Sequence, residues 1–250
     1  MWAVITGATS GIGKEMAVYL SQLGYQLILT GRNQHQLEKM QQRLPTRVEV
    51  IPLDLSEEQA PFQLYAFCKG RQVDLLVNNA GYGLFGTFDQ IDLEDELNML
   101  NVNIRALHIL TKLFLRDFKK RNRGRILNVA SSAGFLTGPL LSSYYASKNY
   151  VVRLTMAIYE ELRRSNSRVT VSLLCPGPVD TNFNSRAGVQ FSMPPASPRA
   201  VARYGIDGAL RGKLLLIPGL GVRLGVFASR FVPHKLMSAI TYEIQKKKLN

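Results

Sequence analysis

Cysteine, long apolar runs and acidic residues are all scarce in this sequence. Its two cysteines, Cys68 and Cys175, are too few for a disulfide-stapled fold or a four-cysteine zinc site. No stretch reaches the roughly 18 apolar residues of a membrane-spanning helix. The three histidines are scattered without metal-ligand spacing, and no secretory signal follows Met1. We therefore expect a soluble cytoplasmic protein with no metal site.

The shortage of acidic residues makes the chain strongly basic. It has 31 Lys+Arg against 18 Asp+Glu, a formal net charge of +13. From Arg186 to Asn250, eleven basic residues face only Asp207 and Glu243, which leaves a net +9 in the last quarter. Such a segment can bind nucleic acid, an anionic membrane or an anionic ligand, or it can simply be a solvated face. No basic-aromatic stacking motif or recognition helix accompanies it, so we expect no nucleic-acid partner.

Short β-branched runs alternate with amphipathic stretches along the whole chain. Strands are expected at Trp2–Thr6, Gln26–Gly31, Arg47–Pro52, Leu75–Asn78, Arg125–Val129, Val169–Cys175 and Lys213–Ile217. Helices are expected at Gly11–Leu23, Gln34–Leu44, Glu57–Lys69, Glu94–Lys120, Ser142–Arg164 and Arg199–Leu210. Several strands are apolar on both faces and therefore need helices above and below them. The sequence predicts an α/β fold over residues 1–250: a single-domain doubly wound (Rossmann) parallel sheet of about seven strands with helices on both faces.

A glycine-rich turn, Thr6 to Gly13, joins the first expected strand to the first helix. Glycine lets the backbone turn sharply and brings amide groups close to a pyrophosphate. The helix N-terminus adds about half a positive charge. The spacing is G-x-x-x-G-x-G, which differs from the general dinucleotide pattern G-x-G-x-x-G.

With this spacing, the chain resembles the short-chain dehydrogenase/reductase (SDR) family, and the family's other motifs follow in order. These are Asp54-Leu55, Asn78-Asn79-Ala80-Gly81, Asn101-Val102-Asn103, Asn128-Val129-Ala130-Ser131-Ser132, Tyr144-Tyr145-Ala146-Ser147-Lys148 and Pro176-Gly177-Pro178-Val179-Asp180-Thr181. The resemblance covers nearly the whole chain. It implies hydride transfer between a nicotinamide cofactor and a carbonyl or alcohol.

The family pattern also selects the catalytic residues. Y-x-x-x-K counted back from Lys148 selects Tyr144 rather than Tyr145, and the family's serine, thirteen residues earlier, is Ser131. The resemblance implies that Tyr144 exchanges the proton, with its pKa lowered by the Lys148 cation, and that Ser131 binds the substrate oxygen. Asn103 would anchor a water that relays protons to Lys148, which also holds the nicotinamide ribose.

Cofactor choice depends on the end of the second strand, where Arg32 stands and no acidic residue follows. A guanidinium there can pair with a 2′-phosphate, so NADP is preferred and NAD remains possible. The cofactor-binding residues implied are Gly7, Thr9, Ser10, Gly11, Ile12, Gly13, Arg32, Asn33, Asp54, Leu55, Asn79, Ala80, Gly81, Tyr144, Lys148, Pro176, Gly177, Val179 and Thr181.

The substrate side carries weaker signals. Apolar loops predict a lipophilic carbonyl or secondary-alcohol substrate, with a lid over residues 182–212. In the basic extension, residues 218–250, Leu224, Phe227, Phe231, Leu236 and Ile240 could form one face of two short helices interrupted at Pro233. That face could cap the crevice or pack against another subunit, which we favour, or it could rest on anionic lipid.

The extension weakly resembles the 3-oxoacyl and fatty-acyl-type reductase branch, and the family implies a homodimer or homotetramer. Two alternatives remain: a non-catalytic dinucleotide-binding scaffold or sensor, and a basic peripheral membrane-surface protein.

Overall fold

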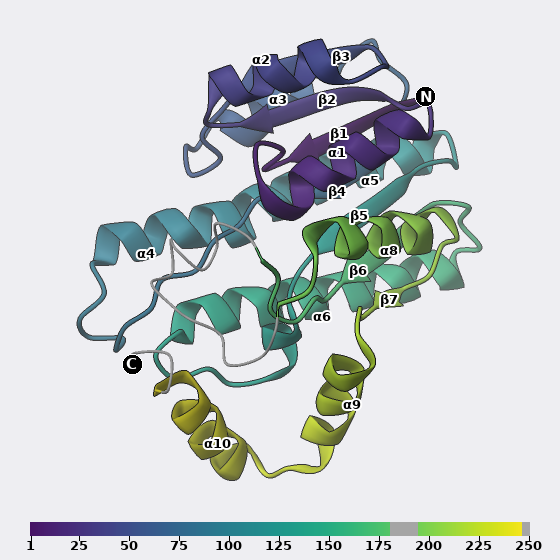
Figure 1. Cartoon of the computed structure of the whole chain (residues 1–250). Coiled ribbons are helices and arrows are strands. Elements are labelled where there is room, and N and C mark those ends of the chain that lie inside the picture. The colour runs from purple at the N-terminus through teal and green to yellow at the C-terminus, as the bar shows by residue number, and fades with distance from the viewer. Residues whose placement is uncertain (181–194, 247–250) are drawn as a thin grey trace.

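Strands and helices alternate along the chain as the sequence predicts (Figure 1). The structure is a computed structural model that describes residues 1–180 and 195–246. Its strands are β1 (Trp2–Thr6), β2 (Gln26–Gly31), β3 (Val48–Pro52), β4 (Val73–Asn78), β5 (Arg125–Val129), β6 (Thr170–Leu174) and β7 (Leu215–Leu216). Its helices are α1 (Gly11–Gln22), α2 (Gln34–Arg43), α3 (Ala60–Phe67), α4 (Leu93–Leu100), η1 (Asn101–Ala106), α5 (Leu107–Lys120), η2 (Ser132–Phe135), α6 (Ser142–Arg164), α8 (Pro198–Leu210), α9 (Leu220–Ala228), η3 (Ser229–Phe231) and α10 (His234–Lys246).

The strands form one parallel seven-stranded sheet in the order β3-β2-β1-β4-β5-β6-β7, which confirms the predicted fold class. The strand order reverses between β1 and β4, where Ile5 pairs with Leu29 on one side and with Val77 on the other. In doubly wound sheets, ligands bind outside the carboxyl ends of the strands at this reversal. The carboxyl ends of β1, β4 and β5 therefore define the edge to search for a site.

Alternating apolar side chains hold a layer of helices on each face of the sheet. In β1, Ala3 and Ile5 pack with α1, α2 and α8, whereas Val4 packs with α3, α5 and α6. All three side chains are fully buried. Burying one aliphatic side chain of this kind contributes about 1.5–3 kcal/mol. Figure 1 shows α1 and α8 on the same face of the sheet.

The long helix expected over Glu94–Lys120 is instead three segments. α4 and α5 are α-helical, but η1 between them is a π-helix that contains the buried Asn103. π-Segments are rare and occur frequently at functional sites, because the extra residue redirects the side chains around it. No glycine or proline within the segment signals the change.

The prediction of a lid over residues 182–212 is wrong for residues 198–210, which form α8. α8 is a core helix that packs against α1 and fully buries Ala202 and Ile206. Of the remainder, residues 182–194 lie outside the described residues.

The C-terminal segment forms two helices, α9 and α10, that lie beyond the sheet beside η2 and α6 (Figure 1). Pro233 lies between them, as predicted. Within this chain the predicted face does not cap the crevice, because its five residues are exposed: Leu224, Phe227, Phe231, Leu236 and Ile240. Its packing against another subunit stays a prediction. Val226, Thr241 and Gln245 are buried instead. No described helix is both long and apolar enough to cross a membrane.

Candidate active site

The turn between β1 and α1 is a backbone cradle that fits a pyrophosphate. Gly7 and Gly11 adopt positive φ angles of 64° and 52°. A Cβ on Gly7 would come within 2.9 Å of the Ala80 Cα, so the turn has no room for a side chain there. Ser10 precedes α1 without a side-chain cap, and the first turn of the helix has no acid. The first amide groups of α1 and its dipole are thus left for an anion.

Asn79 fastens this cradle to the end of β4. Its Nδ2 atom donates hydrogen bonds to the backbone oxygens of Thr6 at 3.0 Å and Gly7 at 3.1 Å. In return, the Thr6 hydroxyl accepts from the amides of Asn79 and Ala80, both at 3.0 Å. The glycine turn and the β4 end are therefore held as one unit at the reversal of the sheet.

A cleft of about 630 Å³ extends from this cradle across the carboxyl ends of β4, β5 and β6. The predicted residues that line it are Gly7, Thr9, Ser10, Gly11, Ile12, Arg32, Asn33, Asp54, Leu55, Asn79, Ala80, Gly81, Ser131, Tyr144, Lys148, Pro176, Gly177 and Val179. Gly13 does not line it: Gly13 is buried where a Cβ would meet the Gly7 oxygen at 2.4 Å. Its role is close packing of α1 on the turn. Thr181 lies outside the described residues.

Arg32 stands at the mouth of the cleft beside Asp54, with 3.6 Å between Nη1 and Oδ2. Burial raises the pKa of the Asp54 carboxyl, but hydrogen bonds from Ser56 and the nearby Arg32 outweigh it, so this pKa lies below its ordinary value. Both side chains remain partly exposed. Asn33 caps α2 by accepting from the Gln36 amide at 3.0 Å. Arg32 is thus the cation beside the cleft at the end of β2.

Ser131, Tyr144 and Lys148 meet at the inner end of the cleft. Ser131 ends the loop after β5, and its hydroxyl accepts from the Ala133 amide at 3.2 Å. Tyr144 and Lys148 lie one turn apart on α6, with Nζ 5.8 Å from the tyrosine ring centroid. Nζ also donates to the Val129 oxygen at 3.2 Å.

Burial controls the protonation of this group. It lowers the pKa of Lys148 to about 8, because the ammonium is desolvated. It raises the pKa of Tyr144 well above the ordinary value, against the opposing effect of a hydrogen bond with Ser131. The sequence resemblance implied a lowered tyrosine pKa, and the structure contradicts this. At about pH 8, Tyr144 is therefore neutral and Lys148 is about half protonated.

Asn103 lies behind the cleft rather than in its lining. Its amide accepts from the Tyr82 amide at 3.1 Å and donates to the Tyr82 oxygen at 2.9 Å and the Ser147 hydroxyl at 3.0 Å. A Cβ on Gly81 would lie 2.9 Å from Asn103 Oδ1 and 3.1 Å from Lys148 Nζ. The π-helix η1 thus brings Asn103 against the backbone that Lys148 also approaches.

A buried polar network beneath the cleft ties the central strands to two helices. Asn78 Nδ2 donates to the Thr111 hydroxyl at 3.0 Å and to Asn128 Oδ1 at 2.9 Å. Asn128 Nδ2 donates to the Thr155 hydroxyl at 3.0 Å. Buried networks of this kind fix relative positions, because breaking one bond leaves an unpaired polar atom in a low dielectric. The network holds β4 and β5 in register with α5 and α6.

Sequence reasoning missed Ile244 and Gln245, which extend from the end of α10 into the lining of the cleft. The Gln245 amide donates to the Tyr145 hydroxyl, and its buried Oε1 has no partner among the described residues. These residues are a hundred positions from Tyr145, and nothing in their local sequence indicates the contact. Only the packing of α10 reveals it.

Comparison with known proteins agrees with this geometry. Residues 1–190 match the family model described as short chain dehydrogenase. A very-long-chain 3-oxoacyl-CoA reductase from Mycosarcoma maydis is 33% identical over 182 residues, 69% of this chain and 51% of that protein. A 7beta-hydroxysteroid dehydrogenase from Clostridium sardiniense is 30% identical over 205 residues, 80% of this chain and 76% of that protein.

A solved structure shares the fold over almost the full length. It is a short-chain dehydrogenase from Sphingobium yanoikuyae in complex with NADPH, 26% identical, with a TM-score of 0.81 over 91% of this chain and 95% of that one. The present chain spans about half the length of the matched 3-oxoacyl-CoA reductase.

Proposed function

Because this chain belongs to the short-chain dehydrogenase family of nicotinamide-dependent oxidoreductases, we propose that it transfers a hydride between the cofactor and a lipophilic carbonyl or secondary alcohol. One observation carries the proposal. Ser131, Tyr144 and Lys148 line the same cleft as the glycine cradle after β1. A pyrophosphate on the cradle and a carbonyl at Tyr144 would then share one continuous site.

Each residue of the inner cleft has a distinct task in this reaction. The nicotinamide, when bound, supplies or accepts the hydride. Tyr144 donates the proton to the carbonyl oxygen, and Ser131 donates a hydrogen bond to that oxygen as negative charge develops on it. Lys148, with its pKa near 8, can both release a proton and regain one around neutral pH, and it holds the cofactor ribose. Asn103 is a positioning residue that fixes the Tyr82 backbone.

NADP is the preferred cofactor in this proposal. Arg32 lines the cleft at the end of β2, where a ribose 2′-phosphate would lie, and no acid replaces it on that strand. A guanidinium binds phosphate oxygens through paired hydrogen bonds. The Asp54 carboxylate beside it orients the guanidinium at 3.6 Å but opposes an added anion. NADP should therefore bind more tightly than NAD, but NAD should still be accepted.

A lipophilic substrate fits the apolar side of the cleft. Leu136, Leu141 and Ile244 line it near the inner end. The similar proteins named above act, by their names, on very-long-chain 3-oxoacyl-CoA and on a hydroxysteroid. We infer that the substrate here shares that apolar character. The expected homo-oligomer and cytoplasmic location stay predictions.

A panel assay tests the proposal. NADPH and NADH oxidation should be followed with steroid ketones, 3-oxoacyl thioesters, aldehydes and short polar ketones. We expect turnover with the lipophilic carbonyls, and faster turnover with NADPH than with NADH. Saturable cofactor binding without turnover of any carbonyl or alcohol would instead support a non-catalytic dinucleotide sensor.

A further inference from the structure

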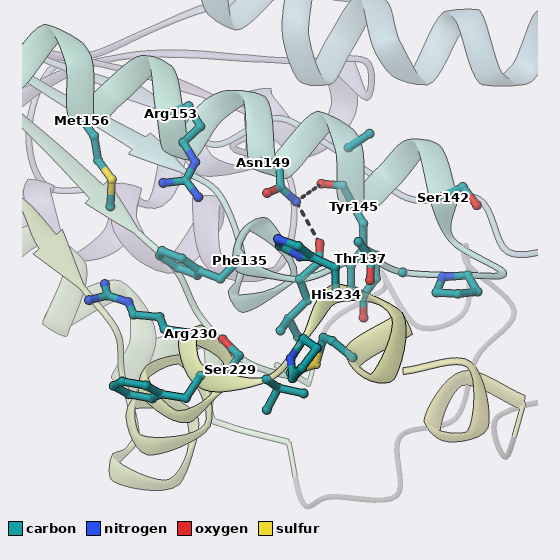
Figure 2. Close-up of a pocket in the computed structure, with 18 residues that line it drawn as sticks. Phe135, Thr137, Ser142, Tyr145, Asn149, Arg153, Met156, Ser229, Arg230 and His234 are labelled. Carbon is teal, nitrogen blue, oxygen red and sulfur yellow. Dashed lines mark hydrogen bonds between the residues drawn. The ribbon is translucent and has the colours of Figure 1, made fainter. Parts of the chain in front are cut away.

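A second cavity, of about 1010 Å³, shares Leu136 and Tyr145 with the catalytic cleft (Figure 2). It is lined by α6, by the loop from Phe135 to Pro139 and by the connection from η3 into α10. The α6 side chains that line it recur every three or four residues: Ser142, Tyr145, Asn149, Arg153 and Met156. Tyr145 and Arg153 are thus about 12 Å apart along one helix face. We call this cavity the trough, and its lining follows α6 from Ser142 to Met156.

The loop that forms one wall of the trough is firmly held. Asn149 Nδ2 donates to the Leu136 oxygen at 2.9 Å and to the Tyr145 oxygen at 3.0 Å, as Figure 2 shows. A Cβ on Gly138 would fall 2.1 Å from the Tyr145 ring, so that ring lies directly on the loop. The Thr137 hydroxyl bonds the Ser238 hydroxyl of α10 at 2.8 Å. These contacts fix the loop that forms this wall of the trough against α6 and α10.

Positive charge gathers at the end of the trough away from Tyr145. Arg153 and Arg230 lie there, on either side of Phe135 in Figure 2, and His234 lies between them and Tyr145. The lining contains no acidic residue. Neither arginine pairs with a carboxylate in the part of the chain that the structure describes, whereas Arg163 on the same helix pairs with Glu160. Two free guanidiniums in an acid-free cavity suit an anion.

The remaining walls are apolar. They are formed by Phe135, Leu136, Met156, Phe231, Val232 and Met237. An inorganic anion would leave this surface exposed to water, whereas a hydrocarbon chain ending in an anion would cover it. Charge and apolar surface together therefore select an anionic amphiphile.

The trough adjoins the catalytic cleft. Leu136 and Tyr145 line both cavities, and the rings of Tyr144 and Tyr145 meet edge to face at 6.0 Å. Gln245 holds the Tyr145 hydroxyl at this boundary. The trough and the catalytic cleft therefore share Leu136 and Tyr145 as a common wall.

We propose that the trough binds the distal, anionic end of the substrate, with the carbonyl at Tyr144, a hydrocarbon chain along α6 and a carboxylate on Arg153 and Arg230. This rests on the proposed function, which it narrows to long-chain carbonyl compounds with an anionic terminus. The two arginines are then specificity-determining residues. They contact no reacting atom and act only on the far end of the chain.

Paired substrates test this assignment. The kcat/KM values of a long-chain oxo acid, its methyl ester and a short-chain oxo acid should be measured for wild type and for the double variant Arg153→Gln with Arg230→Gln. Wild type should prefer the long acid over both other compounds. The double variant should lose about tenfold or more on the long acid, mostly through KM, with the ester unchanged. Added salt should weaken the wild-type preference.

Two controls separate this proposal from its rivals. Arg223→Gln removes an exposed charge from α9 that does not line the trough, and it should leave the preference intact. A saturated long-chain fatty acid should inhibit wild type competitively against the ketone and lose potency in the double variant.

Noncompetitive inhibition would assign the trough to a separate effector and overturn the proposal. An acid preference that appears only with anionic vesicles would assign the arginines to a membrane surface and also overturn it. Absence of turnover with every carbonyl would refute the proposed function itself.

Discussion

The cofactor side of the cleft and the C-terminal segment are built in opposite ways. On the cofactor side, Thr6 and Asn79 exchange hydrogen bonds, and the strands beneath them are buried on both faces. In α9, η3 and α10, few side chains are buried, and Phe231 is 74% exposed. The first region is held by many hydrogen bonds and buried side chains. The second region contacts the rest of the chain through a few side chains such as Gln245. We therefore expect the first region to fix the chemistry and the second to govern substrate choice.

Removing the Tyr144 hydroxyl should give the largest loss of activity, because Tyr144 belongs to the first, densely hydrogen-bonded region. Tyr144→Phe should lower kcat by roughly 10²–10⁴-fold, since the proton donor is lost. Cofactor binding and the unfolding midpoint should hardly change. Steady-state kinetics and a cofactor fluorescence titration measure these quantities.

Tyr145→Phe is the matched control, because it removes a hydroxyl that accepts a hydrogen bond from Gln245 and lies outside the Tyr-x-x-x-Lys pair. It should retain wild-type kcat. Should Tyr145→Phe abolish turnover while Tyr144→Phe does not, the assignment of the two tyrosines is reversed.

Adding one methyl group to each region should affect kcat differently in the two regions. A Cβ on Gly81 would press on Asn103 Oδ1 and Lys148 Nζ, so Gly81→Ala should lower kcat by up to about 100-fold through misplacement. Gly225→Ala in α9 adds the same methyl group where no atom lies within 4 Å. It should leave both kcat and stability unchanged or slightly improved. Similar losses in both variants would contradict the contrast drawn between the regions.

Arg32 lies at the cofactor side but is exposed like the C-terminal arginines. It therefore tests whether an exposed residue can contribute to cofactor binding through its position alone. Arg32→Ala should weaken NADPH binding by about tenfold, the scale of one hydrogen bond to a charged group. NADH binding should change little, because NADH lacks the 2′-phosphate. Equal losses for both cofactors in a fluorescence titration would remove Arg32 from the 2′-phosphate site.

The same contrast explains how far sequence could predict this molecule. The strands and the glycine turn follow from local patterns, because neighbouring residues determine them, whereas Ser131, Tyr144 and Lys148 were predicted through the family resemblance. The π-helix around Asn103 has no such pattern, and its asparagine bonds Tyr82 and Ser147, which are distant in the sequence. Tertiary contacts also decided the core position of α8. The trough beside Tyr145 depends on where α10 docks.

The buried Lys148 and the exposed C-terminal arginines should differ in how stability responds to pH. An arginine stays charged throughout, whereas burial lowers the pKa of Lys148 to about 8, below its ordinary value of 10.5. Below pH 8 both folded and unfolded chains carry the Lys148 charge, and folding must desolvate it. Between about pH 8 and 10.5 the unfolded chain binds more protons than the folded one, so stability gains at most about 1.4 kcal/mol per pH unit.

Urea unfolding of wild type and Lys148→Met across pH 7 to 11 measures this smallest effect, because the difference between them isolates Lys148. Lys148→Met should be the more stable protein at neutral pH, and its advantage should shrink as the pH rises above about 8. Arg153→Gln, which removes an exposed charge from the same helix, should show no such trend. If the wild-type and Lys148→Met curves stay parallel from pH 7 to 11, the lysine is solvated in the folded protein. That result would contradict a lowered pKa for Lys148 and the proton exchange near neutral pH assigned to this residue.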